Sequence, residues 1–209
     1  MTEPSAPDPE AELRALCDEQ RWSEAATLVF ERYGRELMTY LVAIARSETD
    51  GAEAFSQFTE DLWRGLPRFR WQSSARTWCY TLARNALFRV RRSVRRRGGP
   101  AIALSDAPAA AQAAEQVRTA TLTYLRTQVK DEVAALRERL SPDDQAILIL
   151  RIDRKLPWLD VARALADANE EELPDAELTR RSATLRKRFG RIKSDLKKLL
   201  ARQLGDRDR

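Results

Sequence analysis

Apolar residues recur every three or four positions through most of the chain, which is the spacing of amphipathic helices. The clearest example follows Ser73 and Ser74, either of which suits a helix N-cap, and stops at Gly98-Gly99-Pro100. No stretch of Val, Ile or Thr alternates with polar residues as a strand would. The sequence therefore predicts an all-α fold. The buried face of this helix is expected to comprise Ala75, Trp78, Cys79, Leu82, Ala83, Ala86, Leu87, Val90 and Val94.

Composition divides the chain into two small helical domains. Residues 1–20 are expected to be an N-terminal extension and residues 21–97 the first domain. Residues 98–115 are rich in Ala, Gly and Pro, which predicts a flexible linker before a second domain at 116–209. In that domain a short helix from Pro157 precedes a basic amphipathic helix from about residue 175. This order is typical of a helix-turn-helix, whose second helix enters the DNA major groove.

Several function classes are disfavoured by what the sequence contains. The chain has 209 residues and no histidine, which removes the commonest general base and metal ligand. Cys17 and Cys79 are not spaced as a metal site, and Cys79 is expected to be a buried, inert thiol. We therefore expect no enzyme activity, no cofactor, no metal and no small-molecule substrate. No apolar stretch approaches the roughly 18 residues of a membrane span, and the acidic start is unlike a signal peptide, so we expect a cytoplasmic protein that binds no membrane.

Charge is arranged in blocks of alternating sign. Residues 1–61 carry 5 basic and 14 acidic residues, and residues 106–178 carry 9 and 15. Residues 62–105, by contrast, carry 11 arginines and no acid, and residues 179–209 carry 12 basic and 3 acidic residues. Two basic regions separated by acidic ones indicate two contacts with a polyanion. Because phosphate attraction carries no sequence information, specificity has to come from particular side chains.

The first basic block also contains aromatic residues, in the stretch RFRWQSSARTWCYTLARN at residues 68–85. Arginines beside exposed aromatic rings form a stacking platform for unpaired bases. Trp78 is assigned to the core by its spacing, whereas Tyr80 and Phe88 are expected on the arginine-rich face. The residues before the helix, 69–74, are expected to enclose a flipped base, and we call them the capture loop.

These residues carry a family resemblance. FRWQSSARTWCYTLARN resembles the second conserved region of the extracytoplasmic-function (ECF) sigma factors of bacterial RNA polymerase, which typically read F-R-G-E-S-S-F-R-T-W-L-Y-x-I-A-R-N. ERYGRELMTYLVAIAR and DLWRGLPRFR look like the first helix and the polymerase-binding helix of the same domain. LRERLSPDDQAILILRIDRKLPWLDVARAL and TLRKRFGRIKSDLKKLL look like the family's fourth region and its recognition helix.

The resemblance implies that the first domain binds core polymerase and melts the minus-ten promoter element, while the second reads the minus-35 element as duplex. The implied partners are promoter DNA and core RNA polymerase, through its beta and beta-prime subunits, with an anti-sigma factor left open. The implied polymerase contacts are Glu53, Glu60, Asp61 and Trp63. The implied minus-35 contacts are Arg181, Thr184, Arg186, Lys187, Arg188 and Arg191. The implied minus-ten contacts are Arg68, Phe69, Arg70, Trp71, Gln72, Ser73, Ser74, Arg76, Tyr80, Arg84, Asn85, Phe88, Arg91, Arg92 and Arg95.

The sequence departs from the family in two places. Trp71 and Gln72 stand where the family usually has Gly and Glu, so the base preference of the capture loop is open. Residues 168–177 form an acidic insertion where a helix-turn-helix has a turn of only three or four residues. We infer that the insertion points away from DNA, toward polymerase or a regulator, or that promoter reading is altered.

Two other interpretations remain at this point. One is a polymerase-independent helix-turn-helix regulator that binds duplex DNA through residues 141–200, with the first domain as a dimerisation or effector module. The other is a helical adaptor whose basic faces are merely solvated.

Overall fold

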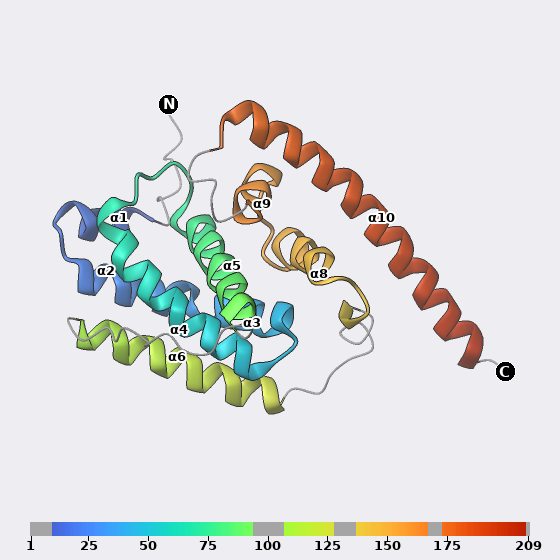
Figure 1. Ribbon diagram of the computed structural model, residues 1–209, viewed down its shortest axis with the longest axis horizontal. Coiled ribbons are helices and arrows are strands. Elements are labelled where there is room, and N and C mark those ends of the chain that lie inside the picture. The colour runs from blue at the N-terminus through green and yellow to red at the C-terminus, as the bar shows by residue number, and fades with distance from the viewer. Residues whose placement is uncertain (1–9, 94–106, 128–136, 167–172, 208–209) are drawn as a thin grey trace, which may run out of the picture.

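The computed structural model describes residues 10–93, 107–127, 137–166 and 173–207, and the regular structure in these ranges is helical (Figure 1). The predicted all-α fold is confirmed. The helices are α1 (Ala11–Asp18), α2 (Trp22–Val29), α3 (Arg35–Ala45), α4 (Glu48–Gly65), α5 (Ala75–Ser93), α6 (Pro108–Thr127), α8 (Pro142–Leu148), α9 (Trp158–Ala164) and α10 (Asp175–Arg207). Short π-helical turns follow α2 at Phe30–Gly34 and α8 at Ile149–Asp153, and a 3-10 turn at Leu66–Arg68 follows α4.

Helix α5 lies at the centre of the molecule. It packs along α4 and crosses α3, and on another side it contacts α9 (Figure 1). The α3–α4 contact depends on Gly51, because a Cβ there would lie 2.9 Å from the Cα of Val42. Ser47 begins α4, its hydroxyl accepting the Asp50 N–H at 3.1 Å. A close backbone contact thus joins α3 to α4, and both helices share a core with α5.

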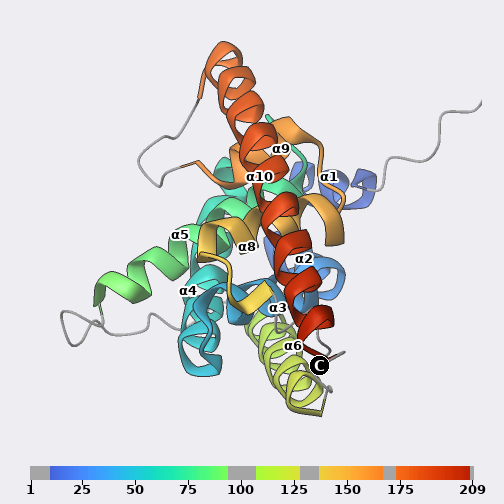
Figure 2. The same ribbon diagram turned by 90° about the vertical axis from the view of Figure 1, so that its right-hand side faces the viewer.

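Helices α8 and α9 rest on the N-terminal helices, α8 against α3 and α9 against α5. Leu150, Leu156, Val161 and Ala164 join the same hydrophobic cluster as the residues of α3, α4 and α5. Helix α10 crosses α9 and α8 on the outer side, as Figure 2 shows, and its C-terminal end extends away from the other helices (Figure 1). The parts that we expected to be separate domains are therefore in direct contact, and their division into functional domains stays a prediction.

The expected linker at 98–115 is wrong for residues 108–115, which open helix α6. This helix packs against α2, α3 and α4, and Ala110 and Ala114 are buried in the contact. The Cβ of a residue replacing Gly34 would meet Val117 of α6 at 2.9 Å, which shows how close the two segments lie. Residues 98–106 lie outside the described residues. Although we expected residues 116–127 to begin the second domain, they pack on the first.

Within the described ranges, no helix combines the length and the apolar character that a membrane span requires.

Candidate nucleic-acid interface

The capture loop connects α4 to α5 and is built around three aromatic rings. Phe69 stacks on Trp78 of α5, with ring centres 4.4 Å apart and planes 16° apart, and contacts Trp71 at 4.7 Å. Trp71 has φ of 57°, a left-handed backbone conformation that is uncommon outside glycine. All three rings are partly buried against the core. Arg68, Arg70 and Gln72 are exposed around them.

Ser74 is the N-cap of α5, which decides between the two serines considered from the sequence. Its hydroxyl accepts the N–H of Thr77 at 3.0 Å, as an N-cap side chain does. The hydroxyl of Ser73 donates to the Ser74 carbonyl at 3.2 Å. The predicted helix start is therefore confirmed at this residue.

Tyr80 occupies a different position from the one we expected. Its side chain is 0% exposed and meets Tyr40 of α3 edge-to-face, with ring centres 5.2 Å apart. Burial is the main cause that raises the pKa of Tyr80. The expectation that Tyr80 lies on an exposed face is wrong, because α3 covers the side of α5 from which this ring projects. No base can stack on Tyr80 in this arrangement.

Arg84 and Phe88 lie together on α5, the guanidinium of Arg84 4.4 Å above the Phe88 ring. The Arg84 side chain is only 12% exposed, since it donates to the carbonyl of Ala166 at 3.0 Å and lies 3.7 Å from the Asp143 carboxylate. Both partners come from residues 140–166, which we call the covering segment. Asn85, one turn from Thr81 on the same helix, has a buried amide oxygen without a hydrogen-bond partner among the described residues.

Arg76 is held in the same way. It donates two bonds of 2.7 Å to the Glu36 carboxylate and one of 3.0 Å to the carbonyl of Arg154 in the covering segment. The hydrogen bonds with Glu36 are the main cause that raises the pKa of Arg76. Arg154 itself lies 3.7 Å from Glu36. The covering segment thus supplies carbonyl and carboxylate oxygens to the α5 arginines, in the role that phosphate oxygens take in a nucleic-acid complex.

The remaining minus-ten candidates on α5 lie near its C-terminal end. Arg92 is exposed, whereas Arg91 is half-buried and donates to the carbonyl of Ile44 at 2.6 Å. Arg95 lies outside the described residues. The structure therefore brings Arg68, Arg70, Gln72 and Arg92 to the surface, and places Arg76, Arg84 and Arg91 in contacts within the chain.

The minus-35 candidates lie on the N-terminal half of α10. Thr184, Arg186, Lys187 and Arg191 are exposed. The other two are bound within the chain, Arg181 to Glu177 at 3.0 Å and Arg188 to Asp144 at 2.6 Å. A groove of about 250 Å³ between α9 and α10 is lined by Leu165, Arg180, Arg181 and Thr184, among others. Arg180, which sequence reasoning did not select, has a 78% exposed side chain beside this groove.

The polymerase-contact candidates lie on α4. Glu53 is exposed, and Glu60 is 3.8 Å from Arg64. Asp61 pairs instead with Arg89 of α5, and burial is the main cause that raises its pKa. Trp63 packs partly buried against the core. Glu53 and Glu60, two turns apart, share one face of the helix, whereas Asp61 is turned toward α5.

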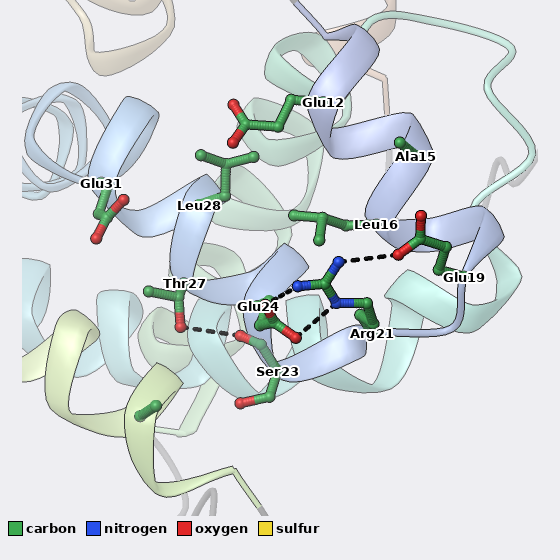
Figure 3. A pocket seen from close by; sticks show the side chains of 11 residues that line it. Glu12, Ala15, Leu16, Glu19, Arg21, Ser23, Glu24, Thr27, Leu28 and Glu31 are labelled. Atoms are coloured by element: carbon green, nitrogen blue, oxygen red, sulfur yellow. Dashed lines mark hydrogen bonds and ion pairs between the residues drawn. The ribbon is translucent and has the colours of Figure 1, made fainter.

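A cavity of about 510 Å³ lies between α1 and α2 (Figure 3). Glu12, Glu19, Glu24 and Glu31 line it, and the guanidinium of Arg21 bridges Glu19 and Glu24 with bonds of 2.9 and 2.8 Å. A lining with four carboxylates repels phosphate. The cavity is therefore not part of the nucleic-acid interface.

Two residues that sequence reasoning missed lie against the capture loop. Glu10 and Arg14, in the N-terminal extension, contact the start of α5 and the ring of Trp71. They are more than 50 positions away in the chain, so no spacing or local motif could have found them.

Comparison with known protein families gives a match for part of the chain. Residues 29–97 match the family of Sigma-70 region 2, which spans the end of α2, helices α3 to α5 and the capture loop. No curated protein and no solved structure matched the chain. The family match supports a sigma factor, a non-catalytic initiation factor that binds core RNA polymerase and promoter DNA.

Proposed function

We propose that the chain is a sigma factor of the ECF type that directs core RNA polymerase to specific promoters and helps to melt them. The observation that carries the proposal is that two independent features occur in the same segment. The region 2 match at residues 29–97 contains the capture loop and α5, which belong to a 44-residue run with 11 arginines and no acid. The residues that match the family therefore also carry the arginine and aromatic side chains that are suited to binding unpaired bases.

In the minus-ten step, the exposed Arg68 and Arg70 attract the phosphates of the opened strand, and an unpaired base enters beside Trp71 and Gln72. The left-handed backbone at Trp71 turns the chain sharply there, which separates the indole from the following polar residues. Ser73 and Ser74 provide hydroxyl groups at the end of the loop. Arg76, Arg84, Asn85 and Phe88 join this surface only after the covering segment has moved, whereas Tyr80 stays buried against α3.

In the minus-35 step, the exposed face of α10 enters the major groove. Thr184, Arg186, Lys187 and Arg191 lie on this face near the N-terminal half of the helix. Arg181 and Arg188 reach DNA by exchanging Glu177 and Asp144 for phosphate oxygens. Residues 168–172 of the acidic insertion lie outside the described residues, and we propose that the insertion faces polymerase or a regulator.

Polymerase binding is assigned to the outer face of α4, with Glu53 and Glu60 as its charged contacts and Asp61 and Trp63 beside them. The proposed partners are the beta and beta-prime subunits of core polymerase in the cytoplasm, with an anti-sigma factor as a candidate regulator. When polymerase binds α4, the covering segment leaves α5 and the two basic surfaces become available together.

The test is run-off transcription with purified core polymerase and a library of promoters. Transcripts that start at a defined sequence only when this chain is present support the proposal. Glu53→Ala combined with Glu60→Ala should reduce polymerase affinity, and Glu12→Ala on α1 is a control of the same chemistry outside the proposed contact. Absence of any promoter-dependent transcript would reject the proposal.

The alternative is a polymerase-independent regulator, and the exposed basic face of α10 favours it because that face needs no rearrangement. Tight, sequence-specific binding of the free chain to duplex DNA, without polymerase-dependent transcripts, would establish this alternative.

A further inference from the structure

The carboxylate of Glu10 caps helix α5 from outside the helix. Its two oxygens accept the backbone N–H groups of Ala75 at 2.8 Å and Arg76 at 3.1 Å. These are the first two N–H groups of α5, which have no partner inside the helix. Glu10 is 7% exposed, and Tyr33 donates its hydroxyl to it at 3.2 Å. A buried carboxylate with three donors is a fixed part of the fold.

Tyr33 is suited to remain a donor. Burial, together with the nearby Glu10 carboxylate, raises the pKa of Tyr33 to about 12. The phenol therefore keeps its proton across the physiological range. With Ser74 capping Thr77, the first three N–H groups of α5 are all occupied, two of them by the N-terminal segment.

One turn further along α1, Arg14 contacts the capture loop. Its guanidinium lies 4.2 Å above the ring of Trp71, which is a stabilising cation-π contact. Trp71 itself lies outside the helices and carries an uncommon backbone angle. Arg14 covers one face of the indole and the Phe69 contact orients the ring from the side.

We infer that Glu10 and Arg14 are positioning residues for the capture loop, holding residues 71–76 in the shape that receives an unpaired base. Both lie before the residues matched by Sigma-70 region 2, so this loop is held from outside the matched domain. The inference rests on the proposed function for its role in promoter opening, but the contacts themselves are independent of it.

The Glu10 contact also affects where the strand binds. A helix N-terminus attracts phosphate through the same N–H groups and the helix dipole. Glu10 already occupies them with a carboxylate, so a promoter phosphate is excluded there and is directed to Arg68 and Arg70. The base is then left at the Trp71 side of the loop.

The first experiment measures amide hydrogen exchange in the full chain, without DNA or polymerase. Glu10→Ala should speed exchange at Ala75 and Arg76 about tenfold, in line with the loss of a helix cap, while Thr77, capped by Ser74, changes little. Glu10→Gln keeps one acceptor oxygen and should recover part of the protection. Glu12→Ala, two residues away with a 63% exposed side chain, is the matched control. Unchanged exchange at Ala75 and Arg76 would overturn the inference.

The second experiment follows opening with 2-aminopurine in the minus-ten element of a promoter found by run-off transcription. Glu10→Ala and Arg14→Ala should slow the fluorescence rise about tenfold while the affinity for core polymerase stays within twofold. Equal losses of opening and of polymerase affinity would indicate general unfolding and overturn the positioning role. If the wild-type chain gives no promoter-dependent transcript, the proposed function fails, and the exchange measurement still decides whether Glu10 caps α5.

Discussion

At the scale of single residues, the side chains of α5 have two kinds of partner. Its apolar residues, such as Cys79 and Leu87, pack into the core as their spacing predicted. Two of its arginines, Arg76 and Arg84, are withdrawn from solvent because Glu36 and the covering segment supply oxygens to them. The position of a residue around the helix does not predict its burial when the neighbouring helices are unknown. Tyr80 was predicted to be exposed because the sequence does not show that α3 packs on that side of α5.

Tyr80 gives a stability prediction. Its hydroxyl is buried without a hydrogen-bond partner among the described residues, so Tyr80→Phe should leave the free energy of unfolding unchanged or raise it by about 1 kcal/mol. Tyr80→Ala should lower it by about 3–5 kcal/mol through cavity formation. Urea denaturation measures both, with the 42% exposed Tyr124→Ala as control. A loss of more than 1 kcal/mol in Tyr80→Phe would show that the hydroxyl has a partner.

Cys79 gives a prediction on reactivity. Burial is the main cause that raises its pKa, and the Glu10 and Glu36 carboxylates add to it. Because the thiolate is the reactive form, Cys79 should stay unlabelled by iodoacetamide at pH 8 in the native protein and react fully in urea. A cysteine introduced at the exposed position Ser194 should react in both conditions. Mass spectrometry of the digested protein distinguishes the sites, and native labelling of Cys79 would contradict its burial.

At the scale of elements, the starts of helices were predictable because their signals are local. Ser74 and Pro157 each begin a helix where the sequence indicated one. The start of α6 was missed at Pro108, although Pro is favoured at the first helical position and Ala has the highest helix propensity. Composition alone was interpreted as a linker, and the contact with α2 that holds this helix is not visible in the sequence.

The candidate site was predictable only in part. The serine pair located the start of α5 correctly, whereas the role of the capture loop, which the acid-free charge block indicated, stays a prediction. The contacts of Glu10, Arg14 and Glu36 join segments far apart in the chain, and a single sequence contains no local trace of such pairings. For the same reason the occupation of Arg76 and Arg84 by the covering segment could not be foreseen.

Two glycines give an element-scale prediction. Gly51→Ala should lower the free energy of unfolding by about 1–3 kcal/mol, because the new methyl group meets the Val42 backbone at 2.9 Å and forces α3 and α4 apart. Gly190→Ala on α10 has no atom within 4 Å of the added Cβ, so it should stabilise the protein by about 0.5–1 kcal/mol. Thermal unfolding checks both. Equal effects of the two changes would show that the α3–α4 contact adapts freely.

At the scale of the whole molecule, the covering segment links the two basic surfaces. It contacts α5 through the carbonyls of Arg154, Arg163 and Ala166. Some of its buried residues, such as Leu150 and Val161, belong to the same hydrophobic cluster as α5. Hence the free chain presents Arg68 and Arg70 beside the capture loop, whereas Arg76 and Arg84 of α5 are held by contacts within the chain. Single-strand binding should use different residues in the free chain and in the polymerase complex.

Arg68 and Arg84 separate these two states. Arg68 is exposed beside the capture loop, whereas Arg84 is bound to Ala166 and Asp143. For the free chain, Arg68→Ala should weaken binding of a labelled single-stranded oligonucleotide and lower the dependence of log K on log salt by about 0.7, as expected for one lost phosphate contact on a single strand. Arg84→Ala should not weaken it. Fluorescence anisotropy across a salt series provides the measurement.

In the complex with core polymerase, both substitutions should reduce promoter opening, because we propose that the covering segment then leaves α5 and makes Arg84 available to a phosphate. The difference between the two assays decides the question, because a general loss of folding would reduce both oligonucleotide binding and promoter opening. If Arg84→Ala weakens oligonucleotide binding by the free chain as much as Arg68→Ala does, the covering segment does not shield α5 in solution. If Arg84→Ala has no effect in either assay, Arg84 serves only to hold the covering segment in place.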